Sequence, residues 1–173
     1  MQAYRFPARA VRAAPAAFTF LAAALGASAT SSQTANAQEF PFQYAAKFVC
    51  GRVGASPNLP PVAPGFYYTA INVHNPAAQE INKLRKKFAI ALPGEKVGKI
   101  SGFFTMDLKA DEAMEIDCPD ILKHLDMPQG QFVKGFAVIQ SARELDVVSV
   151  YTAANSPTGP ITTMALERVP KRP

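Results

Sequence analysis

Two neighbouring segments near the C-terminal end of the chain have apolar side chains on both faces of an expected strand. They cover residues 132–140 (FVKGFAVIQ) and 145–153 (LDVVSVYTA), and a short turn at 141–144 joins them. Both segments are rich in β-branched and aromatic residues, which favour strands. A strand that is apolar on both faces belongs near the middle of a covered sheet. We therefore expect a central hairpin that supplies a large share of the core.

Shorter segments with alternating apolar residues precede and follow this hairpin, and turn-forming pairs such as Pro93-Gly94 separate them. One short helix is expected after Asp117, because aspartate is a favoured cap and Pro119 is tolerated in the first turn of a helix. The expected elements besides the hairpin are strands at 42–50, 66–74, 80–92, 98–108, 113–118 and 161–169, and the helix at 119–125.

This order of elements predicts an all-β fold. We expect an antiparallel β-sandwich of seven or eight strands, immunoglobulin-like, with one short helix near 119–125. The longest connection, at 51–65, holds four prolines, which exclude a helix or a central strand. It is expected to be a surface loop, either a plain linker or a candidate binding loop.

The first residues have the pattern of a secretory signal peptide. Arg5, Arg9 and Arg12 form a basic region without acids, and an alanine-rich apolar run follows. Ala35-Asn36-Ala37 then fits the rule of small residues before a cleavage site, so we expect a signal peptide at 1–37. A membrane anchor is the alternative, but the apolar run is short and weakly hydrophobic for a span of about 20 residues.

Removal of this leader changes both the length and the net charge of the chain. The remaining part, 38–173, has about 136 residues and fits a single β-sandwich domain. Three arginines lie in the leader, so its loss lowers the formal net charge from +5 to about +2, which gives no electrostatic indication of nucleic-acid binding. No later stretch is long enough to form a transmembrane segment. The expected location is therefore secreted or periplasmic.

Cys50 and Cys118 are the two cysteines of the chain, and both follow the predicted cleavage site. Cysteine pairs in exported proteins are usually bridged. A disulfide here closes a loop of about 69 residues, for which the chain-entropy model gives about 4 kcal/mol of stabilisation. A pair of free thiols and a metal site that uses both sulfurs are the alternatives. The absence of a CxxC motif disfavours thioredoxin-like redox chemistry.

Four short motifs carry a resemblance to a known class of proteins: KFVCG, YTAINVHNP, DEAMEIDC and FVKGFAVIQS. Together they resemble exported bacterial β-sandwich proteins, immunoglobulin-like or fibronectin-like, of unestablished function. In such domains an apolar strand often ends in an Asn-Pro corner, and Cys50 and Cys118 are spaced about as in an immunoglobulin intersheet bridge. The chain has no tryptophan, which departs from the immunoglobulin pattern. The resemblance covers 42–169 and implies no catalytic residues.

A run of carboxylates is the first candidate for chemistry, because calcium prefers six to eight oxygen ligands. The spacing of an EF-hand is absent, and alternating acids on one strand are also typical of a solvated face. A zinc site would need His74 and His124 together with a carboxylate, whereas two solvated histidines are the common case. The candidate metal ligands of the acidic run are Asp107, Asp111, Glu112, Glu115, Asp117 and Asp120.

Two further groups of residues could bind a partner. A basic strip formed by Lys83, Arg85, Lys86 and Lys87 could pair with the acidic run across a sheet, contact an anionic glycan, lipid head group or acidic protein, or simply face solvent. Aromatic residues beside the proline-rich loop could bind a sugar or a protein by stacking, or pack in the core. These aromatic residues are Phe66, Tyr67 and Tyr68.

No catalytic signature such as GxSxG occurs in the sequence. We therefore expect an exported non-enzymatic binding or structural module of the periplasm or cell exterior, with a protein or a glycan as its partner and without a cofactor. One alternative is a small metal-dependent hydrolase that uses the acidic run at 107–120. Another is a surface assembly subunit that donates or accepts strands.

Overall fold

The computed structural model describes residues 39–55 and 62–172, which belong to one compact unit, Ala37–Pro173. The predicted signal peptide at 1–37 and the centre of the proline-rich loop lie outside the described residues. Within the described ranges, no helix is long and apolar enough to cross a bilayer.

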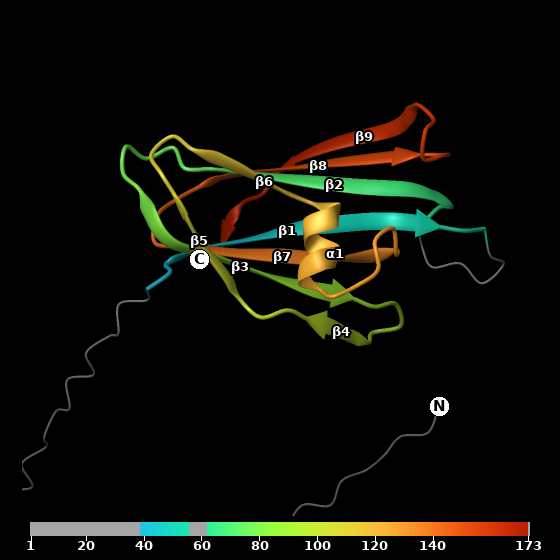
Figure 1. Cartoon of the computed structure of the whole chain (residues 1–173), viewed down its shortest axis with the longest axis horizontal. Coiled ribbons are helices and arrows are strands. Elements are labelled where there is room, and N and C mark those ends of the chain that lie inside the picture. The colour runs from blue at the N-terminus through green and yellow to red at the C-terminus, as the bar shows by residue number, and fades with distance from the viewer. Residues whose placement is uncertain (1–38, 56–61, 173) are drawn as a thin grey trace, which may run out of the picture. The chain divides into compact units, whose positions relative to one another are not determined.

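The described chain forms two antiparallel sheets that meet at one strand, β1 (Figure 1). The last residues of β1 pair with the first residues of β2, so the hydrogen-bonded path β4-β3-β7-β1-β2-β8-β9 is continuous. The first sheet contains β1 (Phe42–Val53), β3 (Ile81–Ala91), β4 (Val97–Ile100), β5 (Phe104–Leu108), β7 (Val133–Ser141) and β10 (Lys171–Arg172). The second sheet contains β2 (Gly65–His74), β6 (Ala113–Asp117), β8 (Asp146–Ala154) and β9 (Ile161–Arg168).

The predicted all-β antiparallel sandwich is confirmed, as is the single short helix, α1 (Cys118–His124). Asp117 caps this helix, and its carboxylate accepts the N–H of Asp120 at 3.0 Å. The described residues hold ten strands, because the segment expected at 98–108 divides into β4 and β5. The tenth strand, β10, is the pair of C-terminal basic residues, which pairs with β1.

The predicted pairing of the central hairpin is wrong, although both of its strands lie inside sheets. β7 pairs with β1 and β3, whereas β8 pairs with β2 and β9. The connection between them crosses from one sheet to the other, and Leu145 within it is buried and donates its N–H to the Tyr44 hydroxyl at 2.7 Å. A strand that is apolar on both faces needs cover and two partners. β7 obtains both partners from distant segments, whereas β8 obtains one from the distant β2 and the other from β9, which follows it directly.

Gly135 of β7 marks a close approach of neighbouring strands. A Cβ atom at this position would clash with the carbonyl oxygen of Ala89 in β3 and would lie 2.9 Å from the ring of Phe48 in β1. The absence of a side chain therefore lets β3, β7 and the ring of Phe48 pack together in the core of the first sheet.

Helix α1 covers the inner face of the first sheet (Figure 1). Phe48 and Phe88 meet edge to face with ring centroids 6.4 Å apart, and the imidazole of His124 stacks on Phe88 at 5.6 Å. Ile121 and Leu122 of the helix are buried in the same cluster. Burial of each large aliphatic or aromatic side chain contributes about 1.5–3 kcal/mol. The core also contains Tyr44, Ala46, Ile71, Val73, Leu84, Ile116, Leu125, Ala137 and Ile139.

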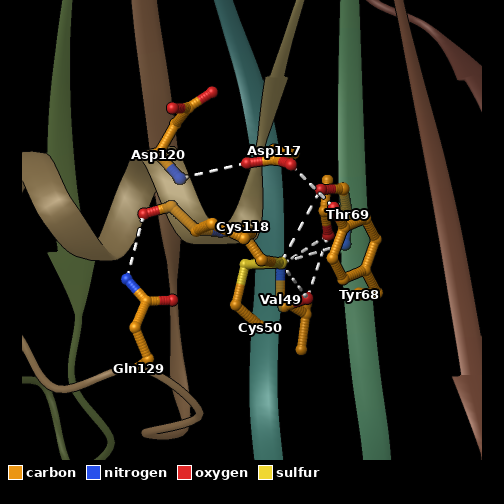
Figure 2. The surroundings of a disulfide bond; sticks show 9 residues. Val49, Cys50, Tyr68, Thr69, Asp117, Cys118, Asp120 and Gln129 are labelled. Atoms are coloured by element: carbon orange, nitrogen blue, oxygen red, sulfur yellow. Dashed lines mark hydrogen bonds between the residues drawn. A yellow bond between two sulfur atoms is a disulfide. The ribbon is translucent and has the colours of Figure 1, made fainter.

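A covalent bond and a buried hydroxyl fix the place where the two sheets meet (Figure 2). The predicted disulfide between Cys50 and Cys118 is confirmed and joins β1 to the first residue of α1, with Cα atoms 5.6 Å apart. The Thr69 hydroxyl of β2 accepts the N–H of Val49 and donates to the carbonyl oxygen of Val49, both at 3.0 Å. Thr69 thus supplies hydrogen-bond partners to the edge of β1 that faces away from β7, at a residue where neither β10 nor β2 pairs with that edge.

Reduction of the disulfide is expected to lower the free energy of unfolding by about 2–5 kcal/mol, because it releases a closed loop of 68 residues in the unfolded chain. Urea unfolding of the oxidised protein and of a Cys50→Ala/Cys118→Ala variant measures this difference. Equal midpoints for the two proteins would show that the bridge carries no stability.

Thr69→Val is expected to lower the free energy of unfolding by about 1–3 kcal/mol, because it leaves the N–H and the carbonyl oxygen of Val49 without their partner. Thr69→Ser keeps the hydroxyl and is the matched control, which should stay much closer to the wild type. Urea unfolding checks the order of the three proteins, and a valine variant as stable as the serine variant would contradict it.

Candidate binding groove

The two faces of β1 have different surroundings where the sheets diverge. On one face Cys50 is bonded to α1 and Phe48 packs in the core. Side chains alternate along a strand, so Lys47 and Val49 point to the opposite face. There they meet the inner face of β8 and β9 across an open groove with a volume of about 360 Å³, which lies in the size range of small-ligand sites.

The floor of this groove continues the core-facing side of the second sheet. In register across three strands, Thr69 lies opposite Tyr151, and Tyr151 lies opposite Ala165. Toward one end of the sheet, this face is buried core, with Ile71 and Val73 fully covered. Toward the other end the first sheet no longer covers it, and the same face becomes the groove.

A second recess of about 500 Å³ continues from the groove toward the start of β2. The two hollows share Tyr67, Tyr68 and Ala153 in their linings. Arg52 lies over the ring of Phe66 in the second recess, 5.5 Å from its centroid. We call the groove and this recess together the tyrosine groove.

Hydrogen bonds hold the tyrosines of the tyrosine groove in place. Tyr67 and Tyr151 belong to the groove face of the second sheet, whereas Tyr68 lies beside them in β2 with its side chain on the opposite face. The hydroxyl of Tyr151 donates to Glu167 and that of Tyr68 donates to Asp117, both at 2.8 Å. The hydroxyl of Tyr67 donates to the backbone carbonyl oxygen of Ala63, and its ring meets Phe132 edge to face at 6.1 Å. The rings are therefore set at fixed angles before any ligand arrives, which lowers the entropic cost of binding.

The environment also fixes the protonation state of two of these hydroxyls. Burial, together with the bond to Glu167, raises the pKa of Tyr151 to about 12. Burial and the hydrogen bond to the Asp117 carboxylate likewise raise the pKa of Tyr68 to about 12. Both groups are neutral hydrogen-bond donors throughout the physiological range.

The sequence identified one side of the tyrosine groove and missed the other. The predicted aromatic group, Phe66 to Tyr68, lies in its lining, next to the described end of the proline-rich loop. Lys47, Tyr151 and Glu167 were not predicted, because they come from β1, β8 and β9 and converge only in the folded chain. Tyr151 lies in a segment that the sequence assigned to the core, and only the divergence of the sheets uncovers it.

The structure does not bring the acidic run together. Among residues 39–55 and 62–172, no group of three or more His, Cys, Asp or Glu side chains is arranged to hold a metal ion. Asp107 of β5 accepts the N–H of Lys83 across the irregularity in the pairing of β3 with β5, and Glu112 accepts the N–H of Lys109 within a local turn. Asp117 and Asp120 belong to the cap and first turn of α1, Asp111 lies near His74, and Glu115 is exposed.

The two histidines have separate surroundings. His74 lies between two carboxylates, with Nε2 3.1 Å from Asp111 and Nδ1 3.5 Å from Asp146. The ring of His124 is packed against Phe104, with centroids 3.9 Å apart. Burial and the neighbouring ammonium group of Lys86 lower the pKa of His124, so this side chain is a neutral part of the core edge.

The basic strip is divided between the two faces of β3. Lys86 points toward α1, where burial lowers the pKa of its ammonium group. Arg85 and Lys87 point to the other face, where both lie over the ring of Phe103, at 4.5 and 4.7 Å. The ion pairs found in the described part of the chain do not join this strip to the acidic run, so the expected cross-strand charge pairing is not formed there.

Comparison with known proteins gave no match among family models, curated proteins or solved structures. The resemblance to exported immunoglobulin-like or fibronectin-like proteins therefore stays a prediction.

The folded protein is expected to release protons from Tyr68 and Tyr151 only near pH 12, whereas unfolded tyrosine titrates near pH 10. Because the folded pKa values are raised, their contribution to stability is complete below pH 10 and is lost as the pH rises toward 12. Ultraviolet absorbance of tyrosinate measures the titration. The variants Tyr68→Phe and Tyr151→Phe should each remove part of the late phase, and an unchanged curve would refute the assignment.

Proposed function

We propose that this chain is an exported, non-enzymatic binding module and that its ligand is a glycan held in the tyrosine groove. The observation that carries the proposal is the set of oriented tyrosine rings that line an open hollow between the sheets. The leader pattern at 1–37 and the Cys50–Cys118 bridge support export, because disulfides persist in oxidising compartments.

A sugar ring matches the chemistry of this surface. Sugars present apolar C–H faces and hydroxyl-rich edges, and tyrosine offers an apolar ring with a polar tip. Tyr67 and Tyr151 lie on the groove face and are half-buried, so part of each side chain is available for contact. Lys47 and Glu167 lie in the lining as a charged donor and a charged acceptor that could bind the hydroxyl edges.

The groove is also long enough for more than one sugar unit. The two hollows of about 360 and 500 Å³ are continuous through their shared residues, and both open to solvent along the edge of the sandwich. An extended chain can therefore lie along Tyr151 and Tyr67 and continue into the second recess. This open and elongated geometry fits a chain of sugar units better than it fits a single enclosed small molecule.

Binding rather than hydrolysis is supported by the carboxylates at the site. Glycoside hydrolysis commonly uses two carboxyl groups that flank the bond to be broken. Among the described residues in the lining of the tyrosine groove, Glu167 is the single carboxylate, and its oxygen already accepts the hydroxyl of Tyr151.

An array of immobilised glycans, probed with the purified 38–173 chain, tests the proposal and identifies the ligand. Ala153→Trp, which fills the groove, is expected to weaken binding at least tenfold, because its side chain lies in both hollows. Val150→Trp adds the same ring to the opposite face of β8 and is the matched control, which should bind like the wild type.

Three results would overturn the proposal. They are a folded protein that binds no glycan on the array, equal binding by the Ala153→Trp variant, and release of sugar fragments by the pure protein. A peptide array probed in parallel distinguishes a protein ligand from the glycan proposed here.

A further inference from the structure

Strand β9 is exposed on both faces along its whole length. All eight of its residues are exposed, and Ile161, Met164 and Leu166 keep 62%, 71% and 71% of their surface in contact with solvent. β9 pairs with β8 on one edge, and in the described part of the chain its other edge has no partner strand. The backbone N–H and C=O groups along that edge are open to pairing with another strand.

The two faces of β9 differ in character. Met164 and Leu166 lie opposite Thr152 and Val150 of β8, so they extend an apolar strip on the outer face of the second sheet. Thr163, Ala165 and Glu167 point to the other side, into the tyrosine groove. The exposed apolar strip belongs to the unpaired edge and not to the groove, so it needs an explanation of its own.

The features that usually protect an edge strand from pairing are missing from β9. Native edges are commonly short or carry lysine, proline or a bulge near their middle. The other edge strands described here, β4, β5, β6 and β10, have between two and five residues each. β9 has eight, without lysine or proline. Its charged residues, Glu167 and Arg168, lie at one end, and the single irregularity in its pairing with β8, between Ile161 and Thr163, lies at the other, so the middle of the strand has none of these features.

We propose that β9 pairs with β9 of a second copy of this chain, antiparallel and about a two-fold axis that passes through Ala165. This symmetry places the same sheet face of both copies on the same side. Met164 of each copy then lies opposite Leu166 of the other, and the two pairs form one apolar cluster on the outer face. A second copy fits this edge because the sequence of β9 is complementary to itself in this register.

The charges of β9 support the same occupant. In this register Glu167 lies opposite Thr163 of the second copy, and Arg168 lies opposite Thr162. No like charges face each other across the pair, because the antiparallel arrangement carries the two charged ends apart. A single pair of eight-residue strands is smaller than a permanent interface, so we expect a reversible dimer with a dissociation constant on the order of micromolar.

Sedimentation of the mature chain over a range of concentrations tests the dimer, and paired charges test its register. Met164→Lys/Leu166→Lys places like charges opposite each other in both cross-strand pairs and should weaken the dimer at least tenfold. Met164→Lys/Leu166→Glu places opposite charges there and should restore it. Both positions are 71% exposed, so both variants should unfold at nearly the wild-type temperature.

Spin labels attached at Ala165→Cys and at Ile161→Cys give an independent measure of the register. Labels at 165 should lie close together across the axis, whereas the backbones at 161 should be about 27 Å apart, since each residue adds about 3.4 Å of strand in each copy. A wild-type protein that stays monomeric at all concentrations overturns the proposal, as does a distance minimum away from Ala165. Neither result depends on glycan binding, which Ala153→Trp tests separately.

Discussion

The bond between Cys50 and Cys118, together with the Thr69 hydroxyl, fixes the point on which the two-sheet arrangement depends. On the side away from β7, β1 pairs with β10 only near its start and with β2 only at its last three residues, so its middle is an edge of the first sheet. Over the stretch between, Thr69 takes the place of a partner strand for Val49, and the disulfide ties β1 to α1. Besides these links, the sheets are held at this angle by side-chain packing and by the three-residue pairing of β1 with β2.

The angle between the sheets accounts for both the core and the tyrosine groove. On one side of β1 the helix fills the space, and the aromatic cluster of Phe48, Phe88 and His124 forms there. On the other side no element of the described chain fills it, and the same alternation of side chains leaves Lys47 and Tyr151 facing an open hollow. The groove thus arises where a continuous sheet face passes from covered to uncovered.

The sequence predicted what depends on local pattern and missed what depends on distant partners. The sequence predicted the strand β2, the helix cap at Asp117 and the disulfide. The first two depend on residue types that lie close together in the chain, and the third depends on the chain having a single pair of cysteines. The sequence could not predict that β7 and β8 belong to different sheets. A strand with two apolar faces can pair with its neighbour in the chain or with a remote strand, and both arrangements bury those faces. Glu167 and Lys47 were missed for the same reason.

The pairing of β1 with β7 has a consequence for how the chain is made. Phe42 pairs with Ser141, and the second sheet is likewise closed by strands from the last third of the chain. Folds dominated by contacts between remote residues form slowly. Neither sheet can be completed until the last third of the chain has been made, because β7 closes the first sheet and β8 and β9 close the second. The disulfide has the same requirement on a smaller scale, since Cys118 follows Cys50 by 68 residues.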